Sequence, residues 1–197
     1  MKIAYEKQGF CGDKTFGFCW NETDRAEDDS FFFGDFNIFV NNTKILNGEF
    51  VYDINIALWQ LKQSLLSIKS NVITNSDSSK EDLYMSAYRY RKYWTYIEDE
   101  KYKDLTKGLE WDDPKVDEIL EEIDNELNSY EKECSFGGIE LDLYYEITDQ
   151  GWHFFLFQNK EKTKDRLIYS NDNGKTVYEV QLELGTVERV LSELPDL

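Results

Sequence analysis

The sequence has too few histidines and cysteines to build the common metal and disulfide sites. His153 is the only histidine among 197 residues, which excludes a histidine-rich metal site. The three cysteines, Cys11, Cys19 and Cys134, are odd in number and widely spaced, so neither a disulfide framework nor a zinc site is predicted. We expect reduced thiols, as in a cytoplasmic protein, and no metal or other cofactor.

Long apolar segments are also missing. No apolar run approaches the roughly 18 residues that a membrane-spanning helix requires. The first ten residues, MKIAYEKQGF, lack the apolar stretch of a signal peptide. We therefore predict a cytoplasmic protein that does not bind membranes.

Catalytic motifs are absent as well. The sequence has no nucleophile elbow, no P-loop and no glycine-rich dinucleotide motif. Carboxylate pairs abound, but among 40 acidic residues they say nothing about glycosidase chemistry. His153 alternates with Phe155 and Phe157 on one predicted strand face, which favours a packed or hydrogen-bonded histidine over a catalytic one. We expect no catalytic residue and no enzyme.

What the sequence does have is negative charge. The 40 acidic residues face 22 lysines and arginines, which gives a net charge of −18. Such a protein repels nucleic acids and attracts basic partners. The alternative is that acidity serves only solubility. The 16% of aromatic residues supports a folded core despite this charge.

Turn residues divide the two ends of the chain into short strands. Residues 139–184 predict a four-stranded antiparallel meander with a tight turn at Asn173-Gly174, and Thr186 is predicted to cap a final helix. Near the N-terminus we predict two hairpins and a polar loop between them. The first hairpin pairs residues 3–8 with 15–20 and turns at Gly12-Asp13, so that Cys19 faces Glu6. The polar loop covers residues 21–30. The second hairpin pairs residues 31–40 with 43–46 and turns at Asn41-Asn42.

Apolar residues at helical spacing predict two helices after these hairpins. Asp53 is a plausible N-cap of the first, whose Trp59 and Leu66 lie off the apolar stripe and are predicted to pack on a second layer, with exposure as the alternative. Ser78 and Glu81 fit a capping box for the second, which Gly108 ends. Its tyrosines alternate with basic residues that could stack nucleobases. Because the net charge opposes nucleic acid, we interpret these tyrosines as covering neighbouring strands.

The most acidic stretch is a third predicted helix, which Asp113 caps and Pro114 begins. From Glu110 to Glu133, eleven acidic residues face two lysines, a net charge of −9. Its apolar stripe is predicted to comprise Val116, Ile119, Leu120, Ile123, Leu127 and Tyr130.

We predict that the opposite face of this helix binds a partner. The candidate partner-binding residues on it are Asp117, Glu118, Glu121 and Glu122, with Trp111 as an aromatic anchor. The loop residues Asp28 and Asp29 form a competing acidic site. A solvated face without a partner is the usual alternative for such a helix.

The chain is thus predicted to be a single α+β domain spanning residues 1–197, with an antiparallel sheet of about seven strands and about four helices. Three of its segments resemble a family of bacterial polymorphic-toxin immunity proteins, the kind encoded beside contact-dependent growth inhibition toxins. The segments are FFFGDFNIFVNNTKIL (31–46), ITDQGWHFFLFQ (147–158) and DRLIYSNDNGKTVYEVQLELGTVERVL (165–191). Residues 76–133 would then be a helical insertion.

The resemblance implies a small cytosolic inhibitor, without catalytic residues, that binds a cognate toxin C-terminal domain. The acidity fits a basic, nuclease-like toxin, and we expect a monomer. Two alternatives remain open: a small hydrolase that uses a carboxylate pair, and an acidic regulatory protein that mimics nucleic acid.

Overall fold

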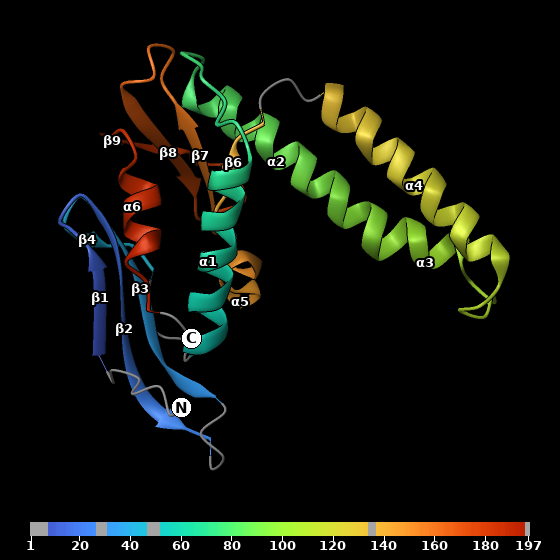
Figure 1. The fold of residues 1–197 in the computed structure, drawn as a ribbon, viewed down its shortest axis with the longest axis horizontal. Coiled ribbons are helices and arrows are strands. Elements are labelled where there is room, and N and C mark those ends of the chain that lie inside the picture. Colours follow the sequence, from blue (N-terminus) through green and yellow to red (C-terminus); the bar gives the residue numbers. More distant parts are fainter. Residues whose placement is uncertain (1–7, 27–30, 47–51, 134–136, 196–197) are drawn as a thin grey trace.

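A computed structural model describes residues 8–26, 31–46, 52–133 and 137–195 (Figure 1). Within these ranges, nine strands form two antiparallel sheets accompanied by six α-helices. The predicted α+β class is confirmed.

The first sheet is built from the N-terminal hairpins. Its strands are β1 (Gln8–Gly12), β2 (Phe16–Arg25), β3 (Phe32–Val40), β4 (Thr43–Lys44) and β5 (Tyr52–Asp53). They follow the order β1-β2-β3-β4, and β5 also pairs with β3. Asn41 and Asn42 adopt positive φ angles of 50° and 62°, so the predicted hairpin turn between β3 and β4 is confirmed.

Two N-terminal predictions were wrong. Gly12 pairs with Gly17 and Phe10 with Cys19, so Cys19 faces Phe10 and not Glu6, which lies outside the described residues. The predicted polar loop begins as strand, because β2 continues to Arg25. The Arg25 guanidinium binds the Glu22 carboxylate at 2.8 Å and lies 4.0 Å from the Phe32 ring centre, which extends the pairing with β3.

The second sheet is the predicted meander, in the order β6-β7-β8-β9. Its strands are β6 (Ile139–Glu140), β7 (His153–Gln158), β8 (Lys164–Ser170) and β9 (Tyr178–Glu183). The first strand is shorter than predicted because the chain folds into helix α5 (Tyr145–Asp149). Tyr144 and Ile147 are both buried there, and a single helical turn places side chains three residues apart on one face.

Asn173 and Gly174 take positive φ angles of 57° and 87°, as the predicted turn requires. The connection nevertheless spans residues 171–177, longer than a two-residue hairpin. Gly174 also allows a close approach, since a Cβ atom there would lie 2.6 Å from the Tyr84 ring.

Two helices connect the sheets through a shared core. Helices α1 (Ile54–Ser70) and α6 (Thr186–Ser192) contact each other, and each packs against strands of both sheets. Asp53 caps α1 as predicted, accepting the Ile56 N–H at 3.2 Å. The N-cap of α6 is Gly185 rather than the predicted Thr186.

The predicted packing of Trp59 and Leu66 on a second layer was wrong. Their side chains on α1 are 54% and 60% exposed. The reason is that both sheets lie on the other side of this helix, so the face with these two residues meets solvent.

The remaining helices project from the two sheets as an arm (Figure 1). Helix α2 (Lys80–Tyr96) continues through a π-helical turn, η1 (Ile97–Lys101), into α3 (Tyr102–Leu105), and α4 (Pro114–Glu133) returns alongside. Gly108 follows α3 with a φ of 84°, as predicted for the end of this helical region. The N-cap of α2 is Ser79 rather than the predicted Ser78, with its Oγ accepting the Asp82 N–H at 3.1 Å.

The two halves of the arm's first helix have different neighbours. Tyr84 and Tyr88 of α2 are buried against Phe155 and Phe157 of β7, which confirms that these tyrosines cover strands. Beyond them, the arm has its own small core of Ile97, Ile123 and Leu127. The outer half of the arm therefore depends on helix–helix packing alone.

Candidate partner-binding surfaces

Helix α4 presents its acidic face to solvent, as the sequence predicts. Asp113 Oδ1 accepts the Lys115 N–H at 3.0 Å, and Val116, Ile123 and Leu127 are buried. On the opposite side, all four predicted carboxylates are exposed: Asp117, Glu118, Glu121 and Glu122. Leu120, which was predicted to be buried, is 42% exposed because it lies at the edge of the stripe.

The predicted aromatic anchor lies in the turn between α3 and α4, at the far end of the arm. The Trp111 side chain is 85% exposed, so its indole ring is accessible to a partner. Trp111 thus lies close in sequence to the carboxylates of α4. The competing site, Asp28 and Asp29, lies outside the described residues.

One carboxylate of α4 faces into the arm. Glu126 accepts hydrogen bonds from the Lys101 ammonium and from the Tyr93 hydroxyl. These bonds lower the pKa of Glu126, and the bond to Glu126 raises the pKa of Tyr93 to about 12. Tyr93 also stacks on Tyr130, with ring centres 4.1 Å apart. The acidic helix is therefore fixed to α2 and η1 by buried apolar contacts and one polar cluster.

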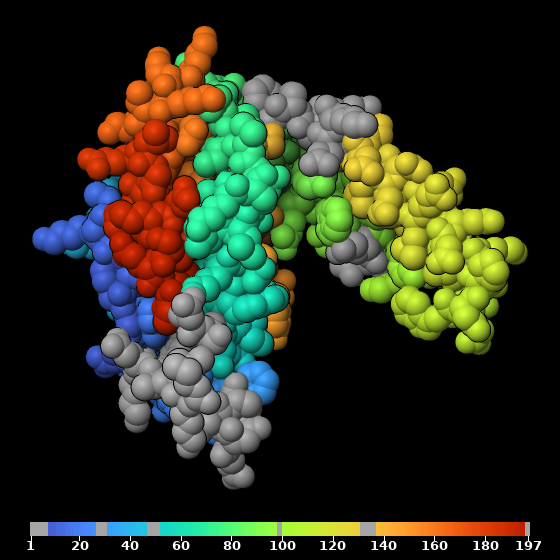
Figure 2. Space-filling view, in the orientation of Figure 1, coloured from blue at the N-terminus to red at the C-terminus, as the bar shows by residue number. Residues whose placement is uncertain are grey.

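A second candidate surface is a hollow where the arm meets the two sheets. Figure 2 shows the molecule recessed between α1 and the arm, and a pocket of about 560 Å³ opens there. Four parts of the chain line it: the end of α1 with the residues after it, the middle of α2, the segment that contains β6, and Phe155 of β7. The residues that the argument uses are Asn71, Val72, Tyr90, Arg91, Trp94, Glu140 and Asp142.

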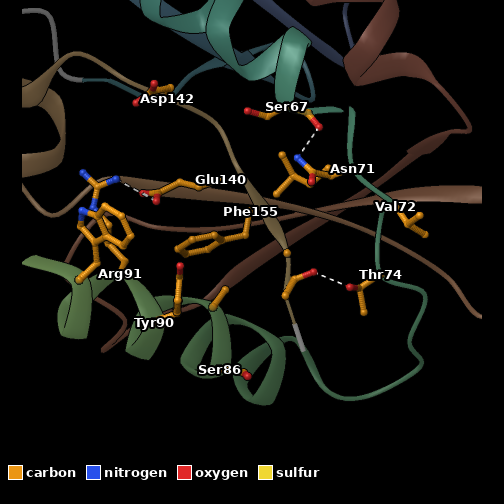
Figure 3. Close-up of a pocket in the computed structure, with 15 residues that line it drawn as sticks. Ser67, Asn71, Val72, Thr74, Ser86, Tyr90, Arg91, Glu140, Asp142 and Phe155 are labelled. Atoms are coloured by element: carbon orange, nitrogen blue, oxygen red, sulfur yellow. Dashed lines mark hydrogen bonds and ion pairs between the residues drawn. The ribbon is translucent and has the colours of Figure 1, made fainter. Parts of the chain in front are cut away.

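The floor of this hollow carries two carboxylates and one guanidinium (Figure 3). Arg91 Nη1 lies 3.0 Å from Glu140 Oε2, and His153 Nδ1 lies 3.3 Å from Glu140 Oε1. Asp142 is held by its backbone, whose N–H donates to Ser64 Oγ at 2.6 Å. Burial, and then the nearby Glu140, raise the pKa of Asp142, while Arg91 acts in the opposite direction.

The histidine at this site is packed, as predicted. His153 is only 6% exposed, and its ring centre lies 4.9 Å from that of Tyr88. It therefore supports the wall behind Glu140 and does not open to the pocket as a general base would have to.

The described residues contain no group of three or more side chains able to hold a metal ion. Cys11 and Cys19 are free thiols, which confirms the prediction for these two; Cys134 lies outside the described residues. Burial raises the pKa of Cys11 to about 12, so this thiol is a poor nucleophile. In the same parts of the chain, no helix is long and apolar enough to cross a membrane.

The pocket could not be predicted from the sequence because its walls come from four distant parts of the chain. Residues 67–74, 86–94 and 137–142 and Phe155 meet only after α2 has packed on the second sheet. The one available signal was the glycine pair at Gly137-Gly138, where a Cβ on Gly138 would lie 2.4 Å from the Phe157 ring.

Comparison with known proteins gives one family and one curated relative. The family described as immunity protein 42 matches residues 10–197. An uncharacterized protein of Pasteurella multocida (strain Pm70) is 34% identical over 90 residues, which are 46% of this chain and 47% of that protein. The match thus spans about half the length of this relative. No solved structure matches the chain.

Proposed function

Because this chain belongs to the immunity protein 42 family, we propose that it protects a bacterial cell by binding and neutralising one cognate toxin domain. The resemblance to immunity proteins of contact-dependent growth inhibition systems supports the more specific form of the proposal. In that form, the partner is the C-terminal domain of such a toxin, and binding takes place in the cytoplasm. The chain acts as a monomer and as a single domain.

The net charge supports a basic partner. At −18, the protein attracts cationic surfaces and accelerates encounter with them. A nuclease-like toxin has such a surface, because its groove must hold phosphates. A row of carboxylates could occupy that groove in place of the nucleic acid, which would block the toxin stoichiometrically.

The outer face of α4, together with Trp111, is the surface that we propose for this contact. The observation that supports it most is the combination of four exposed carboxylates with an 85% exposed tryptophan on one helical hairpin. Aromatic side chains are favoured as interface anchors, and surrounding charges set orientation and specificity. This surface projects from the rest of the molecule, so it can enter a groove.

The test replaces Glu118, Glu121 and Glu122 with lysine. All three side chains are exposed, so we expect the circular dichroism melting curve to remain cooperative. Removing one member of a buried charge pair typically costs about 2–5 kcal/mol. Affinity for the toxin domain encoded beside the gene should therefore fall at least about tenfold, measured by calorimetry, and protection of cells should be lost.

A matched control carries the same change in net charge elsewhere. Asp149, Glu161 and Glu183 are also exposed and none of them belongs to the arm. Their replacement by lysine should slow association slightly through the overall field and leave dissociation unchanged. Equal effects of the two triple variants, or no effect of the first, would rule out α4 as the contact surface.

A further inference from the structure

We propose that the hollow at the base of the arm binds a cationic side chain, an arginine or a lysine, that the partner presents. This inference adds a second contact to the partner interface and so rests on the proposed function. The hollow is independent of the α4 surface, because α4 contributes none of the residues that line it.

The hollow is large enough to admit a side chain of the partner. Its volume of about 560 Å³ lies within the range of about 300–1,000 Å³ that is common for pockets of small ligands. Val72, on the side of α1, is 87% exposed, so the rim is open to an incoming side chain. Trp94, on the side of α2, is 39% exposed.

The charges in the hollow are unbalanced. Glu140 already binds Arg91 and faces His153, so the arginine in the wall is neutralised. For Asp142, no lysine or arginine of the described residues lies within ion-pair distance. The hollow therefore holds two carboxylates against one guanidinium, and a second cation would complete the pairing while an anion would be repelled.

The aromatic wall favours the same class of ligand. The ring centres of Tyr90 and Trp94 are 6.4 Å apart on successive turns of α2, and both residues line the pocket. Cations are attracted to the face of an aromatic ring, most strongly to that of tryptophan. A guanidinium could thus contact the indole while its N–H groups donate to Asp142, a geometry that suits arginine.

The surroundings of Asp142 agree with this assignment. The residue is exposed, so an incoming side chain can reach it. Desolvation and then the nearby Glu140 raise the pKa of its carboxyl group, which means that the protein alone does not fully compensate the ionised form. A cation presented by the partner would provide that compensation. The backbone N–H of Asp142 donates to Ser64 Oγ, which fixes the main chain at this point of the pocket wall.

The first experiment uses acetyl-arginine amide as the probe, and the neutral acetyl-citrulline amide as its isosteric comparison. The full chain, labelled with ¹⁵N, is titrated with each while the Trp94 indole signal is followed by NMR. We expect saturable shifts with the arginine compound and none with the citrulline compound. Asp142→Asn should weaken the arginine binding about fivefold or more, because it removes the charge-assisted hydrogen bond.

The control variant is Asp149→Asn, which makes the same change at an exposed residue outside the pocket. It should bind the probe like the wild type. The proposal is overturned if both compounds shift Trp94 alike, if neither does so up to its solubility limit, or if Asp142→Asn binds arginine as the wild type does.

A second experiment separates this proposal from the proposed function. Toxin affinity is measured for the wild type, the α4 triple variant and Asp142→Asn. If toxin binds and only the α4 variant loses affinity, the pocket contact is wrong and the proposed function stands. If the wild type binds no toxin, the proposed function fails, and the arginine titration still decides what the pocket binds.

Discussion

At the scale of single residues, the polar cluster inside the arm gives the clearest electrostatic coupling in the described residues. Glu126 accepts from both Lys101 and Tyr93, which links α4 to η1 and α2 at the level of the stacked Tyr93 and Tyr130 rings. A phenol that donates to a carboxylate resists ionisation, because the phenolate would face a negative charge. This explains why the pKa of Tyr93 is raised to about 12.

Replacing Glu126 with glutamine should therefore lower the pKa of Tyr93 toward the ordinary tyrosine value of about 10. The measurement is an NMR titration of ¹³C-labelled tyrosine. In the wild type, the raised pKa contributes stability that is complete below pH about 10 and is lost as pH rises toward about 12. The variant should lose less stability over that range.

The matched control is Glu122→Gln, which removes the same charge from the solvent side of the same helix. It should leave the pKa of Tyr93 unchanged. If both variants lower that pKa equally, the cause is the overall negative field and not the hydrogen bond.

At the scale of elements, helix α2 packs against two different parts of the molecule. Its N-terminal half covers the second sheet through Tyr84 and Tyr88, and its C-terminal half forms one side of the arm. Tyr88 also donates a hydrogen bond from its hydroxyl to Asn173 Oδ1 at 2.7 Å. The start of α2 therefore sets both the packing of the sheet and the position of the arm.

We expect Ser79→Ala to cost about 1 kcal/mol of unfolding free energy, since it removes the cap that accepts the Asp82 N–H. Chemical denaturation measures this cost. Ser78→Ala is the control, because the Ser78 hydroxyl bonds Ser76 and does not cap the helix. A larger cost for Ser78→Ala would mean that the helix begins where the sequence alone predicted.

At the scale of the whole molecule, the dominant property is charge. The net charge of −18 includes a local net charge of −9 between Glu110 and Glu133. Most of the described part of this stretch is the projecting arm (Figure 1). Charge on the projecting arm attracts a basic partner before contact forms, and this long-range attraction raises the association rate.

Association with the toxin domain should accordingly slow as salt rises from about 50 mM to about 500 mM, because exposed charges are screened beyond about 8–10 Å at physiological ionic strength. Stopped-flow fluorescence gives the rates. The α4 triple variant should show a shallower dependence than the wild type. A flat response in the wild type would contradict steering and leave shape and apolar contacts as the source of affinity.

The sequence by itself determined the features that depend on neighbouring residues. Asp53 and Asp113 were recognisable as caps because a side-chain oxygen at a helix start needs only the next two or three residues. The turns at Asn41-Asn42 and Asn173-Gly174 were predictable because positive φ is a local requirement. The acidic face of α4 followed from helical spacing, since an apolar stripe on one side of a helix directs the remaining residues outward.

Tertiary structure alone decided what depends on residues far apart. Residues 145–149 are helix rather than the predicted strand, and Ile147 is buried in the core that the two sheets share. Trp59 and Leu66 are exposed because no described element packs on the outer face of α1. Helical spacing shows which residues share a face of a helix, and it does not show which faces other elements cover. The pocket exists only because Asn71, Trp94 and Asp142 meet across three segments. Local sequence encodes propensity, whereas burial and pairing depend on which segments come together in space.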